Sequence, residues 1–219
     1  DEIFVSFKKN IYICKNDMPT KFSVAVILLS VFMVSCTGDN DTSIFPVDCD
    51  LQSGDIVFRR GSGLSSYVVL SADVGGNYSH VGIVADSAGH KMIVHAVPYE
   101  SENDTDRVRM ETPQSFFSST KAGAGAVCRV KCDSSYARKA SELAMAMYKR
   151  GVLFDHDYDD ADTTQMYCCE LVRHVYARVG VNLAEGKQHE ISLPALKTIR
   201  CILPSDIYND TKLNHLQSF

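Results

Sequence analysis

The sequence predicts an α+β domain with a central antiparallel sheet packed by helices. Short runs rich in β-branched and apolar residues, bounded by glycine-containing turns, are typical of strands. Two longer segments repeat their apolar residues every three or four positions, which is typical of helices. Because the predicted strands come before the two long helices instead of alternating with them, the chain fits a segregated α+β arrangement.

Length and composition indicate one folded domain. The chain has 219 residues, of which 45% are hydrophobic and 22% charged, and its formal net charge is −5. That length is enough for one sizeable core. Because no segment carries a stripe of Lys and Arg, we expect no nucleic acid partner. The eight cysteines lack the paired Cys-x-x-Cys spacing of a zinc site, so we expect no metal and no other cofactor. No feature indicates the oligomeric state.

The first 35 residues (1–35) predict an upstream segment and a signal peptide. Residues 22–34 are apolar and follow Lys21, but the stretch is shorter than the roughly 20 residues that span a bilayer. It ends in small residues before Cys36 and so resembles a bacterial lipoprotein signal, although Met33 replaces the usual Leu. The resemblance implies acylation of Cys36 and export to the cell envelope, at the outer membrane or its periplasmic face. The alternative is a buried helix.

The body of the chain begins with strands. Residues 36–49 are polar without periodicity and predict a tether, which leaves 50–219 as the domain. Residues 54–60 predict a strand, and a short helix follows over 64–71. Residues 78–84 and 91–97 then predict the two strands of a hairpin.

The second half of the chain contains the stronger helical patterns. Residues 126–131 alternate as a further strand does. Residues 134–149 predict a helix that ends at a glycine. A second helix is predicted from Cys168 to residue 179, and it also ends at a glycine.

Cys168 is the strongest candidate for a reactive residue. A catalytic thiol must be a thiolate near neutral pH, and the N-terminus of a helix lowers the pKa of a thiol placed there. Cys168 opens the second predicted helix. A single cysteine in such a position is otherwise explained by packing, so a partner imidazole is needed.

His80 and His95 supply candidate partners. They lie in the two strands of the predicted hairpin, each among apolar residues. Neighbouring strands place two imidazoles side by side, one as a base and the other holding its tautomer. One such histidine would be read as a core residue, but two in adjacent strands favour a catalytic arrangement.

These residues fall in blocks that resemble a known family. The blocks are Gly54-Asp55-Ile56-Val57-Phe58, Tyr78-Ser79-His80-Val81-Gly82, Val94-His95-Ala96, Phe154-Asp155 and Tyr167-Cys168-Cys169-Glu170-Leu171-Val172. In this order, with His before Cys, they resemble the YiiX/YebB-like cysteine hydrolases, the circularly permuted branch of the NlpC-type papain-fold peptidases. The resemblance spans roughly 50–180 and implies a permuted papain-like fold.

The resemblance implies a role for each site residue. Cys168 is the expected nucleophile and His80 the base, with His95 as the third member, where closer relatives more often carry Glu. Cys169 occupies a position that is usually Ser, and adjacent helical residues point about 100° apart, so only one thiol can face the histidines. Tyr78, two residues before His80, is a candidate oxyanion donor, with packing at the sheet edge as the alternative. Asp155 matches an acidic position of the family and is a candidate ligand for a substrate amine.

The resemblance further implies a thiol hydrolase that cleaves an amide in cell-wall peptides, especially between D-glutamate and a diamino acid. Two alternatives stay open. The acyltransferase-like cousins of the family suggest a lipid ester or amide as substrate. A non-catalytic binding module, or a zinc site with His80, His95 and Cys168 as ligands, is the other.

Overall fold

The computed structural model describes residues 42–98, 106–158, 163–191 and 198–219. These residues belong to one compact unit, Asp41–Phe219. The predicted signal peptide and Cys36 lie outside the described residues. Within the described part, no helix combines the length and apolar character needed to cross a bilayer.

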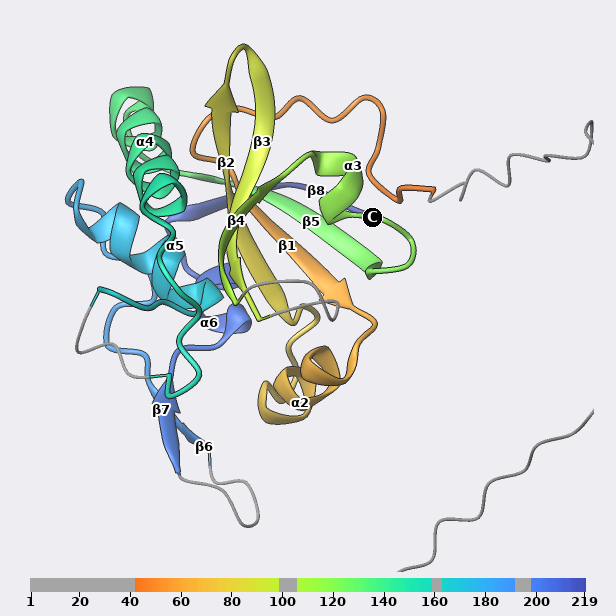
Figure 1. The fold of residues 1–219 in the computed structure, drawn as a ribbon, viewed down its shortest axis with the longest axis vertical. Helices are drawn as coiled ribbons and strands as arrows, with labels where there is room; N and C mark the ends of the chain where they lie inside the picture. Colours follow the sequence, from red (N-terminus) through yellow and green to blue (C-terminus); the bar gives the residue numbers. More distant parts are fainter. Residues whose placement is uncertain (1–41, 99–105, 159–162, 192–197) are drawn as a thin grey trace, which may run out of the picture. The chain divides into compact units, whose positions relative to one another are not determined.

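A six-stranded antiparallel sheet organises this unit, in the order β4-β3-β2-β1-β5-β8 (Figure 1). Its strands are β1 (Ile56–Gly61), β2 (His80–Ser87), β3 (His90–Val97), β4 (Arg107–Glu111), β5 (Ala122–Val130) and β8 (Leu213–Ser218). A separate two-stranded sheet pairs β6 (His189–Ile191) with β7 (Ile199–Cys201). The predicted α+β class with a central antiparallel sheet is confirmed.

The helices are α2 (Leu64–Ala72), α3 (Pro113–Phe116), α4 (Ser134–Arg150), α5 (Cys168–Ala177) and α6 (Pro204–Tyr208). Because alternate residues of a strand face opposite sides, the sheet carries two cores. Phe58 of β1 packs with residues of α4 and α5 in the larger core. Its neighbour Val57 packs with Phe116 of α3 in the smaller one.

The two long helices have clear end signals in the sequence. Asp133 caps α4 by accepting the backbone N–H of Ser135 at 2.8 Å. Gly151 ends α4 in the left-handed conformation, with φ of 67°. The residues expected to be helical over 134–149 and from Cys168 onward therefore form α4 and α5.

The sequence prediction is incomplete at the edges of the sheet. It does not contain β4 or β8, and it places the start of β5 four residues too late, at 126 instead of 122. Gly125 interrupts the strand pattern because an added Cβ would lie 2.4 Å from the Phe219 ring and 2.6 Å from the Phe117 ring. Gly125 thus makes the strand hard to predict from the sequence, and it leaves room for the rings of Phe117 and Phe219.

Residues 42–49 pack on the sheet, although the sequence predicts a tether over 36–49. Ile44 donates its N–H to the Phe117 carbonyl at 2.9 Å. The Phe45 ring stacks on Phe117, with centroids 5.4 Å apart. The compact unit therefore begins earlier than the predicted boundary at residue 50.

Candidate active site

The N-terminus of α5 presents Cys168 to a cleft. Tyr167 has an extended conformation and precedes the first helical residue, Cys168, as predicted. Cys168 is half-buried and lines the cleft, whereas Cys169 is 1% exposed and packs in the larger core. Of the two adjacent thiols, only Cys168 therefore reaches the cleft.

The surroundings of Cys168 favour its thiolate. A hydrogen bond from the Cys169 thiol, with the sulfurs 3.9 Å apart, holds the pKa of Cys168 well below its ordinary value. The charge and hydrogen bond of His80 and the backbone N–H of Val81 also lower this pKa, whereas burial raises it. For Cys169, burial and the neighbouring thiolate raise the pKa. The pKa values of the two adjacent thiols are therefore shifted in opposite directions.

The two predicted histidines meet side by side. His80 begins β2, and its Nε2 lies 2.8 Å from Nδ1 of His95 on β3. Gly82 permits this approach, because an added Cβ there would lie 3.2 Å from the Cβ of His95. His95 is completely buried, and the Phe116 ring packs edge-on against it. The geometry confirms the expectation that the hairpin places both imidazoles together.

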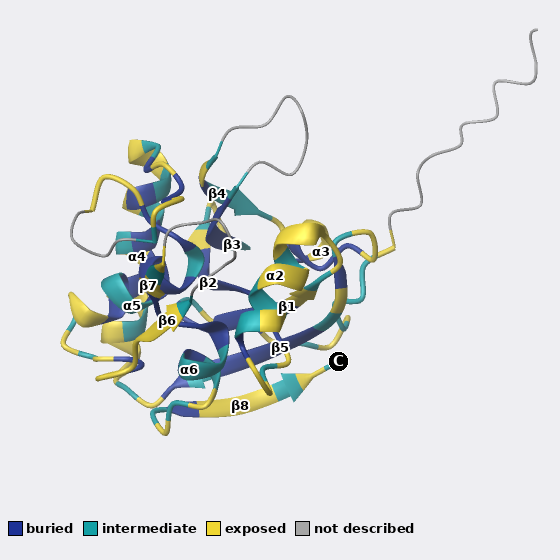
Figure 2. Ribbon diagram, turned by 90° about the horizontal axis from the view of Figure 1, so that it is seen from below, coloured by how far each residue is buried: buried dark blue, intermediate teal, exposed yellow. Residues whose placement is uncertain are grey.

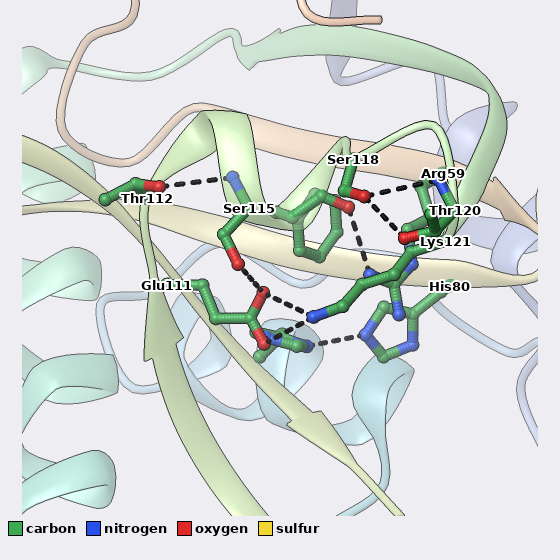
Figure 3. Close-up of polar contacts among 10 residues, drawn as sticks. Arg59, His80, Glu111, Thr112, Ser115, Ser118, Thr120 and Lys121 are labelled. Atoms are coloured by element: carbon green, nitrogen blue, oxygen red, sulfur yellow. Dashed lines mark hydrogen bonds and ion pairs between the residues drawn. The ribbon is translucent and has the colours of Figure 1, made fainter. Parts of the chain in front are cut away.

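The structure adds Glu111 to this chain of polar groups, a residue that the sequence analysis did not single out. Its Oε1 lies 3.6 Å from Nε2 of His95. Its Oε2 accepts the hydroxyl of Ser115 at 3.0 Å and Nζ of Lys121 at 3.3 Å (Figure 3). Burial raises the pKa of Glu111, but the contacts with His95, Lys121 and Ser115 outweigh it and hold that pKa below its usual value. Glu111 is therefore a largely buried carboxylate, with its side chain 12% exposed, and is ionised at neutral pH.

The cleft has a volume of about 350 Å³. Its walls come from the end of β1 and the start of α2, from the turn that contains Lys121, and from residues next to Cys168. The lining residues are Arg59, Ser62, Gly63, Leu64, Ser65, Ser66, Val69, Ser79, His80, Val97, Pro98, Thr120, Lys121, Phe154, Tyr158, Tyr167 and Cys168. The volume lies within the range of small-ligand pockets.

The supporting residues predicted from the sequence lie elsewhere. Tyr78 is 7% exposed, its ring packs against Phe58 and Tyr208, and it does not line the cleft. Asp155 is 5% exposed and accepts the backbone N–H of Asp157 at 2.8 Å. Both side chains are buried and neither lines the cleft, so the roles of oxyanion donor for Tyr78 and amine ligand for Asp155 stay predictions.

The facing nitrogens of the two candidate histidine ligands do not fit one zinc ion. His80 Nε2 and His95 Nδ1 are 2.8 Å apart and hydrogen-bonded to each other. Two nitrogens bound to one tetrahedral zinc at about 2.0–2.1 Å stand roughly 3.3 Å apart. Over the described ranges, no group of three or more His, Cys, Asp and Glu side chains is arranged to hold a metal ion.

Comparison with known proteins identifies a family and a fold. A family described as "permuted papain-like amidase enzyme, YaeF/YiiX" matches residues 50–216. The crystal structure of the metalloprotein yiiX from Escherichia coli O157:H7 aligns with a TM-score of 0.61 and 18% sequence identity, over 77% of this chain and 97% of that one. No curated protein matches the chain in sequence. The structural likeness shows that the two proteins share a fold.

Proposed function

Since the chain belongs to the permuted papain-like amidase family, we propose that Cys168 is the nucleophile of its thiol hydrolase reaction, with His80 as base and His95 orienting His80. One observation carries the proposal. Cys168 is the thiol that reaches the cleft, and His80 lines the same cleft, lowers the pKa of Cys168 and contacts His95 at 2.8 Å. This is the arrangement that a thiol nucleophile needs.

The reaction begins when His80 takes the thiol proton of Cys168. The thiolate attacks the carbonyl carbon of the amide, an S–C bond forms, and the carbonyl electron pair moves onto oxygen. Backbone N–H groups in the first turn of α5 stabilise this oxyanion, because a helix N-terminus favours negative charge. The C–N bond then breaks, and His80 gives its proton to the leaving amine.

A thioester on Cys168 remains. Water, deprotonated by His80, attacks the thioester carbonyl, and the S–C bond breaks. His80 returns the proton taken from water to the released thiolate, which restores the starting state, and the acid product leaves. Each step uses groups already present in the cleft.

The substrate we propose is a peptide amide from the cell wall. An amidase family points to a peptide-type substrate. The resemblance described above narrows this to bonds between D-glutamate and a diamino acid. A cleft of about 350 Å³ is large enough for the few atoms on either side of such a bond.

The proposal is tested on the chain from residue 36 onward with muropeptides that contain this bond. Replacing the nucleophile in Cys168→Ala removes the covalent step, so we expect turnover to fall by about 10³-fold or more. Cys49→Ser, which changes a half-buried cysteine that does not line the cleft, is the matched control. Full turnover by Cys168→Ala, with product confirmed by mass spectrometry, would refute the assignment.

A second substrate class, an acyl lipid, is favoured by α2. This helix carries no charged residue and buries none of its side chains. Leu64 and Tyr67 are 81% and 70% exposed, and Leu64 also lines the cleft. An apolar helix at the mouth of a cleft suits an acyl chain. Hydrolysis of acyl-lipid esters or amides at a higher kcat/KM than muropeptides would favour this class, and turnover of muropeptides alone would reject it.

The cellular location we propose is the envelope, with a lipid anchor on Cys36. This proposal is supported by the lipoprotein-like order of Lys21, the apolar residues 22–34 and Cys36. Intact-mass measurement of protein from bacterial membranes should find acyl chains on Cys36, and the Cys36→Ser variant should lack them. An unmodified Cys36 in the membrane fraction would contradict the proposal.

The yiiX neighbour is called a metalloprotein, but the mechanism proposed for this chain contains no metal step. The reason is the geometry of His80 and His95, whose facing nitrogens are too close to share one ion. Metal analysis of the purified chain checks this point, since a stoichiometric ion lost together with activity on chelation would support the zinc alternative.

A further inference from the structure

Glu111 lies where it can act on the catalytic histidines without touching substrate. In the β3–β4 ladder it is paired with Ile93, so its side chain shares a sheet face with Ile93 and, two residues further along, His95. The Glu111 side chain is 12% exposed and the His95 side chain is fully buried. A buried carboxylate 3.6 Å from an imidazole nitrogen is an electrostatic constraint on that ring.

The constraint decides which nitrogen of His95 carries hydrogen. Burial, followed by the charges of His80 and Arg59, lowers the pKa of His95 to about 4, although Glu111 raises it. The ring is therefore neutral at pH 7 and carries one N–H. A lone pair on Nε2 would face the carboxylate of Glu111 and be repelled, whereas an N–H at Nε2 is attracted to it. The hydrogen therefore belongs on Nε2.

This tautomer determines what His80 can do. With hydrogen on Nε2, His95 has a lone pair on Nδ1, which accepts the Nε2–H of His80 across 2.8 Å. The remaining nitrogen of His80, Nδ1, is then left to exchange a proton with Cys168. The opposite tautomer of His95 would donate to His80 Nε2, so a protonated His80 would meet an opposing N–H.

We infer that Glu111 is a positioning residue that holds the Nε2–H tautomer of His95 and so keeps His80 ready to accept and stabilise the proton of Cys168. The inference rests on the proposed function of Cys168 and His80. Glu111 acts on His80 through His95, and it does not line the cleft that Cys168 faces.

The surroundings hold the Glu111 carboxylate in one position. Ser115 on α3 and Lys121 before β5 both donate to it. In Figure 3, these two side chains converge on Glu111. The charged or titratable groups that face His95 are His80 from β2, Glu111 from β4 and Arg59 from β1, and Arg109 stands opposite it in the β3–β4 ladder. Of these, only Glu111 supplies a negative charge.

The test uses the Glu111→Gln variant, which removes the charge and keeps the shape. Iodoacetamide labelling of Cys168 is followed from pH 4 to pH 9, with tandem mass spectrometry separating Cys168 from Cys169. We expect the midpoint to move about one pH unit upward, because protonated His80 loses its acceptor. In muropeptide turnover, kcat should fall by about tenfold or more, with little change in KM.

Two further variants separate positioning from general effects of charge. Glu142→Gln breaks an exposed pair with Lys139 and should leave the labelling midpoint in place. Glu111→Asp keeps the charge, so its labelling midpoint should lie between those of Glu111→Gln and the wild type. A Glu111→Gln labelling profile that coincides with the wild-type profile would overturn the inference.

A measurement on the wild-type chain covers the case in which Glu111→Gln fails to fold. Two-bond ¹H–¹⁵N spectra at pH 7 report the tautomer of each histidine, and we expect His95 to carry hydrogen on Nε2. Hydrogen on Nδ1 would overturn the inference. Failure of the proposed function looks different: the wild-type Cys168 would then label as an ordinary thiol, with a midpoint near 8.5 that is unaffected by His80→Ala.

Discussion

Cys168 and Cys169 are neighbours in sequence, yet their thiols lie in different surroundings. The helix turns successive side chains by about 100°, so one thiol enters the cleft and the other enters the core. The sulfurs stay within 3.9 Å, which allows the protonated Cys169 to donate to the Cys168 thiolate. Cys169 can thus donate the hydrogen bond in place of the Ser hydroxyl that is usual at this position in the family.

This relation predicts different outcomes for two substitutions of Cys169. Cys169→Ser keeps a donor, so the pKa of Cys168 should stay low. Cys169→Ala removes the donor and should raise that pKa by about one unit, as the loss of one hydrogen bond to a thiolate does. Iodoacetamide labelling against pH measures both. Cys132→Ala, a half-buried cysteine that does not line the cleft, is the control, and equal midpoints for the Ser and Ala variants would contradict the relation.

His95 makes the folded state sensitive to acid. Its pKa falls from 6.5 to about 4 on folding, chiefly by burial, so between those pH values the unfolded chain binds a proton that the folded chain does not. Stability should therefore decrease as the pH falls below about 6.5, and the loss is complete below about 4. At about 1.36 kcal/mol per unit, the loss from this residue is about 3 kcal/mol.

Urea unfolding at pH 7 and at pH 4 tests this loss. The difference between the two free energies of unfolding should be smaller for His95→Gln than for the wild type, because the variant has no imidazole to protonate. The exposed His90, changed to Gln, is the control and should behave as the wild type. Equal pH dependence for His95→Gln and wild type would show that burial of this ring does not oppose its protonation.

At the residue scale, the sequence was sufficient where the chemistry is local. Cys168 stands at a helix start, and His80 and His95 stand in adjacent strands, so each position follows from a nearby pattern. Glu111 was missed because its role depends on the β3–β4 register, which no local pattern specifies. Tyr78 and Asp155 were expected near the substrate, but neither lines the cleft, because a place in a motif does not determine which way a side chain points.

At the element scale, long periodic segments were predicted more completely than short ones. The apolar spacing and end signals of α4 and α5 are visible in the sequence alone. By contrast, β8 is an edge strand whose residues are mostly exposed, coloured yellow in Figure 2, and among the described strands it pairs with β5 alone. Such a strand is stabilised by backbone pairing, which side-chain patterns do not report.

The sequence predicts a helix over 64–71, where α2 forms, but the local pattern says nothing about how exposed this helix is. In Figure 2 it is exposed or intermediate along its length. We predict that changing Leu64, Tyr67 and Val68 together to Ser leaves the melting temperature almost unchanged, because exposed side chains contribute little to stability. If α2 binds the apolar part of the substrate, KM should rise severalfold with kcat preserved. Exposed Tyr136 and Leu216, changed to Ser, provide the control, and an unchanged KM would remove α2 from substrate binding.

At the scale of the whole domain, the site depends on contacts between distant parts of the chain. Its four polar residues come from four elements, namely His80 from β2, His95 from β3, Glu111 from β4 and Cys168 from α5. The two ends of the compact unit also meet, because the Phe219 ring lies 5.1 Å from Phe117 and 5.9 Å from Phe45. Phe117 in turn packs at 4.8 Å on Phe116, the residue that covers His95. The segment that contains Phe45 therefore contacts His95 indirectly, through the rings of Phe117 and Phe116.

These contacts predict the effect of starting the chain at residue 50, where the sequence alone would place the domain boundary. Compared with a chain that begins at residue 36, the shorter chain loses the Phe45 ring contacts and the pairing of Ile44 with Phe117. A half-buried aromatic ring and its backbone pairing contribute about 2 kcal/mol, so the melting temperature should fall by about 4–8 °C. Phe45→Ala in the longer chain isolates the ring and should reproduce about half of the change. If both chains unfold at the same temperature, residues 42–49 act as the tether that the sequence predicts.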